Sequence, residues 1–168
     1  MMKTKINFTL FLLFLVACQP TPEPIVPLPN QTPPMEIQAK RDMINFFEYL
    51  NHTKYEQAVN LYGGSYEILE GYNPDIDPAS KSELLKAGCE FNGLTCLQLY
   101  QANLSDKSSN DEFVFTVSFR NPDGSIFELG PCCGATIEEM PPISQFEIHV
   151  KCSSENICQV LDLPPYVP

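Results

Sequence analysis

Apolar residues recur at helical spacing in the first third of this chain. Ile44, Phe47 and Leu50 lie three residues apart, and Met43 and Phe46 widen the same stripe. A stripe of this width is the pattern of an amphipathic helix that packs one face on a core. The pattern therefore predicts a first helix with these five side chains turned inward.

Two more helices are predicted before the chain changes its period. One covers residues 55–62 and ends at Gly63-Gly64, because glycine accepts the left-handed conformation that closes many helices. The other follows Ser80 or Ser82, whose hydroxyl groups can cap a helix start, and it ends at Asn92-Gly93. A loop rich in proline and aspartate separates the two helices.

The second half of the chain alternates apolar and polar residues with a period of two. One side of the clearest alternation consists of Phe113, Phe115, Val117 and Phe119. This is the pattern of a strand with one buried face. The turn at 121–124 contains proline and glycine, so it predicts a hairpin into 126–129. Further strands are predicted over 95–104, 145–152 and 157–163.

Helices followed by a meander of strands predict an α+β fold. In this class we expect the N-terminal helices to pack on one face of a curved antiparallel sheet of four to five strands. The predicted domain covers residues 36–168. This length supports one hydrophobic core and is too short for two.

Two phrases in the helical half carry a family resemblance. Phe46-Phe47-Glu48-Tyr49-Leu50 is followed by Lys54-Tyr55-Glu56-Gln57-Ala58-Val59-Asn60-Leu61-Tyr62. Together with the element order, they resemble the nuclear transport factor 2 superfamily over most of residues 36–163. The resemblance implies a cone-shaped α+β domain. Its members include dehydratases, isomerases and non-catalytic binding domains, so the fold alone names no function. The catalytic pairs of its enzymes have no matching motif here, and no catalytic residue is assigned.

The first seventeen residues have the composition of an export signal. Lys3 and Lys5 precede an apolar run from Ile6 to Val16, which is too short for a resident membrane helix. The run ends in Leu15-Val16-Ala17-Cys18, which resembles the signal of bacterial lipoproteins. The resemblance implies cleavage after residue 17 and a diacylglycerol thioether on Cys18. An ordinary secretory signal that ends near a cysteine is the alternative.

Residues 18–35 combine the candidate lipid site with a run rich in proline. Such a run favours an extended spacer between membrane and domain. Loss of Lys3 and Lys5 with the signal would lower the basic residues from 10 to 8 against 21 acidic ones, a formal charge of −13. A charge this negative repels nucleic acid and anionic lipid headgroups. Membrane contact is therefore expected through the lipid on Cys18.

Four of the six remaining cysteines are predicted to form two short-range disulfides. Cys89 and Cys96 flank a glycine-containing turn, and Cys152 and Cys158 flank the turn between the last two strands. Exported proteins commonly hold such bridges. If Cys152 faces Cys158 across the hairpin, Val150 faces Val160.

Cys132 and Cys133 are adjacent in the chain. They can close a strained vicinal disulfide, pair with the other cysteines, or serve a metal or redox role, and these alternatives stay open. No metal site or cofactor is assigned, because a metal would want further ligands at suitable spacing.

Two groups of residues are candidates for ligand or partner contact. A candidate ligand rim contains Tyr62, Tyr66, Tyr72 and Asp75. The connection Gly130–Ser144 is longer than neighbouring strands require, and long loops on a rigid sheet often carry binding. Its candidate interaction residues are Glu138, Glu139 and Met140. His149 is predicted on the solvent face of its strand, with a general base beside Glu147 as the alternative.

These observations lead to a first functional hypothesis. The chain is expected to be a lipoprotein of the cell membrane or outer membrane that faces outside the cytoplasm and binds a small ligand or an envelope protein. A small-molecule enzyme of the dehydratase or isomerase type, with a cone-shaped pocket, is the first alternative. A structural envelope protein is the second. Nucleic acid is not an expected partner.

Overall fold

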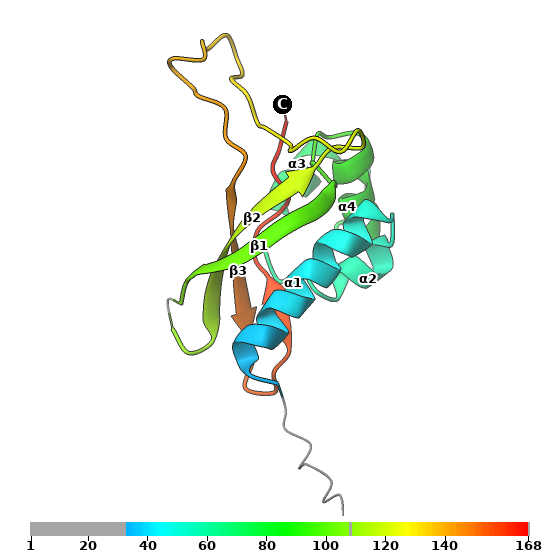
Figure 1. Cartoon of the computed structure of the whole chain (residues 1–168). Helices are drawn as coiled ribbons and strands as arrows, with labels where there is room; N and C mark the ends of the chain where they lie inside the picture. Colours follow the sequence, from blue (N-terminus) through cyan, green and yellow to red (C-terminus); the bar gives the residue numbers. More distant parts are fainter. Residues whose placement is uncertain (1–32, 108, 168) are drawn as a thin grey trace, which may run out of the picture. The chain divides into compact units, whose positions relative to one another are not determined.

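The computed structural model describes residues 33–107 and 109–167 (Figure 1). The signal, Cys18 and most of the proline-rich spacer lie outside the described residues. In the described part of the chain, no helix is long and apolar enough to cross a membrane.

The first helix, α1, spans Met35–Asn51 and begins directly after Pro34. Proline suits a helix start because its missing N–H would have no partner there. The predicted stripe is buried at Met43, Phe46, Phe47 and Leu50. Ile44 is only partly buried, while Ala39 extends the stripe by one turn toward the N-terminus.

Three short helices follow: α2 (Tyr55–Val59), α3 (Glu67–Tyr72) and α4 (Lys81–Glu90). The helix predicted over 55–62 is therefore shorter than expected. Ser80 occupies the position before α4, but its side chain makes no capping hydrogen bond. Gly93 follows α4 with a φ of 78°, the left-handed conformation that is typical of glycine at a helix end.

The prediction of a left-handed cap at Gly63-Gly64 is wrong, because neither glycine has a positive φ. These glycines instead let the chain run close beside the last strand. The Gly63 N–H donates to the Val160 carbonyl at 2.9 Å. A Cβ on Gly64 would lie 2.1 Å from the Leu161 carbonyl oxygen, so a side chain would break this approach.

The strands form an antiparallel sheet in the order β1-β2-β3-β4. Their bounds are β1 Gln98–Asp106, β2 Glu112–Arg120, β3 Phe146–Cys152 and β4 Cys158–Val160. Tyr62 adds one isolated parallel bridge to Val160 at the sheet edge. The α+β class and a four-stranded antiparallel sheet are thus confirmed. The predicted register of the last hairpin is also confirmed, since Val150 faces Val160 and Cys152 faces Cys158.

The hairpin predicted after the turn at 121–124 forms only in part. The turn closes as expected, with Gly124 at a φ of 88°, but 126–129 is not a strand. Arg120 and Ile126 form one bridge, and the Phe127 N–H donates to Phe119. Because β3 pairs with residues 112–117 of β2, only the last residues of β2 are left for the returning chain.

The core lies between α1 and the inner face of the sheet. Phe113, Phe115, Val117 and Phe119 are all at most 1% exposed, which confirms the buried face predicted for β2. Val114 and Ser118 on the opposite face are buried too. Phe47 of α1 meets Phe119 edge to face, with ring centroids 5.1 Å apart. Aromatic pairs of this geometry stabilise a core beyond the burial of their area.

Both predicted disulfides are present. Cys89–Cys96 joins the end of α4 to the segment before β1, with Cα atoms 5.5 Å apart. Cys152–Cys158 closes the β3–β4 hairpin, with Cα atoms 3.9 Å apart. Each bridge therefore fastens neighbouring elements and closes only a short loop.

Replacing Cys152 and Cys158 together with alanine should lower the free energy of unfolding by about 2 kcal/mol, since the bridge restricts the unfolded chain over a short loop. The Cys89→Ala, Cys96→Ala double variant opens a loop of similar length (separations 7 and 6) and should lose a similar amount. Denaturant unfolding followed by circular dichroism measures both. Unfolded protein in native buffer, or no loss in either variant, would contradict this account.

Candidate functional site

The loop Gly130–Ser144, here called the tip loop, is a long and largely exposed segment. Leu129 and Ile143 close its stem with two backbone hydrogen bonds of 2.8 and 3.0 Å. Figure 1 shows the tip loop, in gold, projecting beyond the sheet. The first turn of α1, in blue, lies at the opposite end of the domain.

The tip loop has its own hydrogen-bond structure. The Thr136 N–H donates to the Glu139 carboxylate at 2.8 Å, and the Glu139 N–H donates to the Thr136 hydroxyl at 3.4 Å. This reciprocal pair is the capping box of a helical turn. The Met140 N–H closes that turn on the Thr136 carbonyl at 2.9 Å. Glu139 therefore serves the loop itself, a role that was not predicted from the sequence.

The outward side chains of this turn are apolar as well as acidic. Ile137 is 62% exposed, and Met140 is also exposed, as is Ile143 in the stem. Glu138 is exposed beside them. Glu138 and Met140 were predicted as contact residues, whereas Ile137 was missed because a lone isoleucine in a loop gives no periodic signal.

Cys132 and Cys133 lie at the start of the tip loop. Their sulfur atoms are 2.8 Å apart and not bonded, so the vicinal bridge stays a prediction. Pairing with the other cysteines is excluded, since those four are bonded to one another. Among residues 33–107 and 109–167, no group of three or more His, Cys, Asp or Glu side chains could hold a metal ion.

The four residues of the candidate ligand rim do not gather around one cavity. Tyr62 and Tyr66 meet edge to face with centroids 5.0 Å apart. Tyr72 instead stacks on Tyr166 with centroids 5.9 Å apart, and Asp75 is exposed. The structure thus brings two of the four together.

Tyr62 and Tyr66 are packing groups with different hydroxyl environments. Tyr62 stacks on Phe46, and its hydroxyl donates to the Ser65 carbonyl at 2.9 Å. The Tyr66 hydroxyl is buried without a partner among the described residues, and the Lys81 ammonium lies 4.4 Å from its ring centroid. Burial raises the pKa of Tyr66 to about 12 and also raises the pKa of Tyr62. Both rings are therefore neutral at pH 7.

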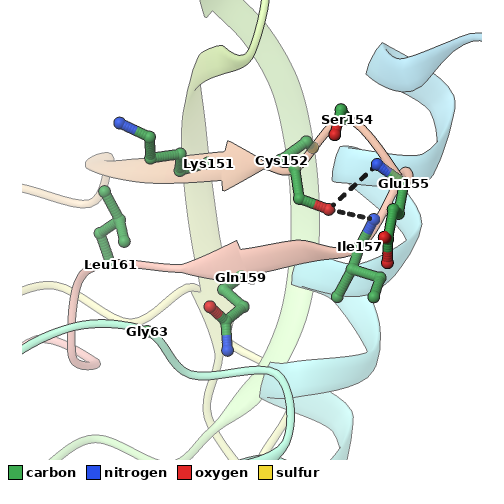
Figure 2. A pocket seen from close by; sticks show the side chains of 9 residues that line it. Gly63, Lys151, Cys152, Ser154, Glu155, Ile157, Gln159 and Leu161 are labelled. Carbon is green, nitrogen blue, oxygen red and sulfur yellow. Dashed lines mark hydrogen bonds between the residues drawn. The ribbon is translucent and has the colours of Figure 1, made fainter.

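A shallow groove of about 530 Å³ runs along the β3–β4 hairpin (Figure 2). Gly63, Gln159 and Leu161 line it together with Lys151 and the hairpin turn. Two of its polar groups already have partners. The Lys151 ammonium pairs with Glu112 at 2.9 Å. The Ser153 hydroxyl accepts hydrogen bonds from the backbone N–H groups of Glu155 and Ile157, each at 3.3 Å and each marked by a dashed line in Figure 2. These pairings stabilise the hairpin.

His149 pairs with a carboxylate that the sequence did not indicate. Its Nδ1 lies 2.8 Å from the Asp162 carboxylate, and its backbone N–H donates to the same oxygen at 2.6 Å. The two side chains are about half exposed, 51% for His149 and 40% for Asp162. They line a hollow of about 220 Å³ in which no hydroxyl or thiol faces them. The pair therefore fastens the chain after β4 onto β3, and Glu147 is not its partner.

Comparison with known proteins gives no family assignment. No protein-family model, no curated protein and no solved structure matches this chain. The functional inference therefore depends on the chain's own residues and their geometry.

The two tyrosines allow a matched substitution test. Tyr62→Phe should lower the free energy of unfolding by about 1 kcal/mol, because it removes a partly buried hydrogen bond. Tyr66→Phe should leave stability unchanged or raise it by up to ~1 kcal/mol, since it removes a hydroxyl group that has no partner. Denaturant unfolding at pH 7 measures both, and equal losses would contradict the assignment.

The Tyr66→Phe variant also tests the raised pKa of Tyr66. Between pH 10, the ordinary value, and about 12, the unfolded chain releases the Tyr66 proton that the folded chain keeps. Stability should therefore fall as pH rises through this window, and less so in Tyr66→Phe. Parallel losses in the two proteins would show that Tyr66 does not contribute.

Proposed function

We propose that this protein is a lipid-anchored, extracytoplasmic binding module that captures a partner protein with its tip loop. The observation that carries the proposal is an exposed loop with an internal capping box, a closed stem and an outward isoleucine. A loop ordered before binding loses less conformational entropy on association.

The environment of the cysteines supports a location outside the cytoplasm. Both local disulfides belong to the described domain, and such bridges persist in oxidising compartments. The leader resemblance supplies the anchor at Cys18. We propose the cell membrane or outer membrane as the site of attachment.

The filled core favours binding over catalysis. We propose a domain of the nuclear transport factor 2 type, in which an enzyme would need an acid or base inside the cone. The inner face of β2 instead carries three phenylalanines that are at most 1% exposed. Among the described residues, no aspartate, glutamate or histidine side chain is buried. These facts support a binding module over a dehydratase or isomerase.

The chemistry of the tip indicates the kind of partner. Ile137 and Met140 offer apolar contact, and Glu138 adds negative charge beside them. A protein groove with an apolar floor and a basic rim complements this surface. Anionic lipid does not, because the domain is strongly acidic.

The attachment point supports presentation of the tip. The spacer reaches the domain at Met35, the first residue of α1. That end of the domain is opposite the tip loop (Figure 1). A membrane anchor on the N-terminal side would therefore leave the tip loop accessible.

The anchor is tested by replacing the candidate lipidated residue. Cys18→Ser should abolish incorporation of labelled fatty acid and shift the protein from the detergent phase to the aqueous phase. Normal labelling and partition of this variant would contradict a lipoprotein. Cys133→Ser, which leaves the leader intact, is the control and should behave as the unaltered protein.

Partner capture is tested at the tip. Replacing Ile137, Glu138 and Met140 with alanine, while Glu139 keeps its capping role, should leave the melting temperature unchanged. Capture from an envelope extract should fall at least about tenfold, equivalent to about 1.4 kcal/mol, because few residues carry most binding energy.

A matched isoleucine at the other end of the domain provides the control. Ile157 in the β3–β4 turn is 58% exposed, close to the 62% of Ile137. Ile157→Ala should leave capture unchanged. Equal loss in both variants, or unchanged capture by the tip variant, would contradict a binding site in the tip loop.

A further inference from the structure

Cys132 and Cys133 are the cysteines of the described chain that belong to no disulfide. They occupy the turn that opens the tip loop. The other four described cysteines are bonded in two local pairs. Any thiol chemistry of the described domain therefore takes place at this turn.

The backbone holds the two sulfur atoms together. Cys133 has a φ of 60° and Gly134 a φ of 90°, two successive left-handed residues. The Ala135 N–H closes the turn on the Cys132 carbonyl at 3.0 Å. A left-handed cysteine is uncommon and needs surrounding structure to hold it. In this turn the Sγ atoms lie 2.8 Å apart, within hydrogen-bond distance.

The two thiols differ in access. Cys133 is exposed, whereas Cys132 is half-buried. Both line a hollow of about 480 Å³ with Phe127, Leu129 and Val167. The hydrogen bond with Cys133 raises the pKa of the Cys132 thiol, and desolvation adds to this effect. Cys133 is therefore the sulfur that meets an incoming disulfide first, and Cys132 is placed to resolve the product.

We propose that Cys132 and Cys133 form a reversible dithiol–disulfide site, oxidised by exchange with an extracytoplasmic disulfide, either a small molecule or an oxidoreductase. The Cys133 thiolate attacks one sulfur of the incoming disulfide, a mixed disulfide forms, and the first thiolate leaves. The Cys132 thiolate then attacks the Cys133 sulfur, the vicinal bond forms, and the second thiolate leaves. The two protein thiols release two protons and two electrons, and the incoming disulfide becomes two thiols.

The proposed Cys132–Cys133 bridge differs from the two structural disulfides in the size of the ring that it closes. Adjacent cysteines close a small ring that includes their own peptide bond, and strained bridges are more easily reduced. Closure also restricts the peptide between two residues that set the first turn of the tip loop. Oxidation should therefore alter how Ile137 and Glu138 are presented. The exchange chemistry itself needs no partner at the tip, so its test is separate from the capture experiment.

Trypsin separates the three cysteine pairs. Cleavage after Arg120 and Lys151 releases 121–151, which contains Cys132 and Cys133 and no other cysteine. Cleavage also releases 87–107 with Cys89 and Cys96, and 152–168 with Cys152 and Cys158. The redox state of each cysteine pair can therefore be measured from the mass of its own peptide, and the two structural disulfides serve as internal controls.

The folded, lipidated protein is equilibrated in mixtures of reduced and oxidised dithiothreitol, quenched with acid, alkylated and digested. Peptide 121–151 should change from two alkylated thiols to a species lighter than the free dithiol by two hydrogen atoms. The bridged-to-dithiol ratio should change about tenfold for each ~30 mV, the slope of a two-electron couple. The other two peptides should remain bridged over the range in which 121–151 titrates.

Single variants test the order of attack. With oxidised glutathione as probe, Cys132→Ser, which keeps the exposed thiol, should form the mixed disulfide at least severalfold faster than Cys133→Ser. Equal rates or the reverse order would overturn the assigned roles. A peptide 121–151 that stays dithiol in every mixture, or that is reduced only together with the two structural disulfides, would overturn the site.

Discussion

The contact between the paired phenylalanines of α1 and the aromatic face of the sheet is the interaction on which the domain depends. Phe47 meets Phe119 at a centroid distance of 5.1 Å, and Phe46 stacks on Tyr62 at 5.6 Å. One pair of adjacent residues thus joins α1 to β2 and to the segment that lies beside β4. Because the rings fill the space between helix and sheet, an interior site would require the core to open. Recognition is therefore expected at the surface.

Local closures hold that surface in place. The two disulfides, the Leu129–Ile143 stem and the contact of His149 with Asp162 each fasten elements that the core already brings near one another. The tip loop extends from this framework with a capped turn of its own. An ordered loop on a packed sheet combines accessibility with low entropy cost on binding.

Features that repeat along the chain were predictable, and features that depend on distant contacts were not. The stripe around Phe47 and the alternation through β2 follow from periodicity, and the register of Cys152 with Cys158 follows from strand geometry. Gly63 was predicted to cap a helix, whereas it lets the chain approach β4 closely, because the sequence does not show which strand lies beside it. The same applies to Asp162, whose partner His149 lies 13 residues away. Thr136 and Glu139 have the spacing of a capping box in the sequence. They were not predicted to form one because Glu139 was expected to contact a partner.

Site-specific photocrosslinking in intact cells tests the central claim most directly, since it traps whichever protein contacts the substituted position. Benzoylphenylalanine would replace Ile137 at the tip, Gln159 in the hairpin groove or Tyr100 on the exposed side of β1. The account predicts a discrete adduct with one envelope protein from position 137 and none from positions 100 and 159. An adduct from position 159 with none from position 137 would contradict it and would place recognition in the groove of Figure 2.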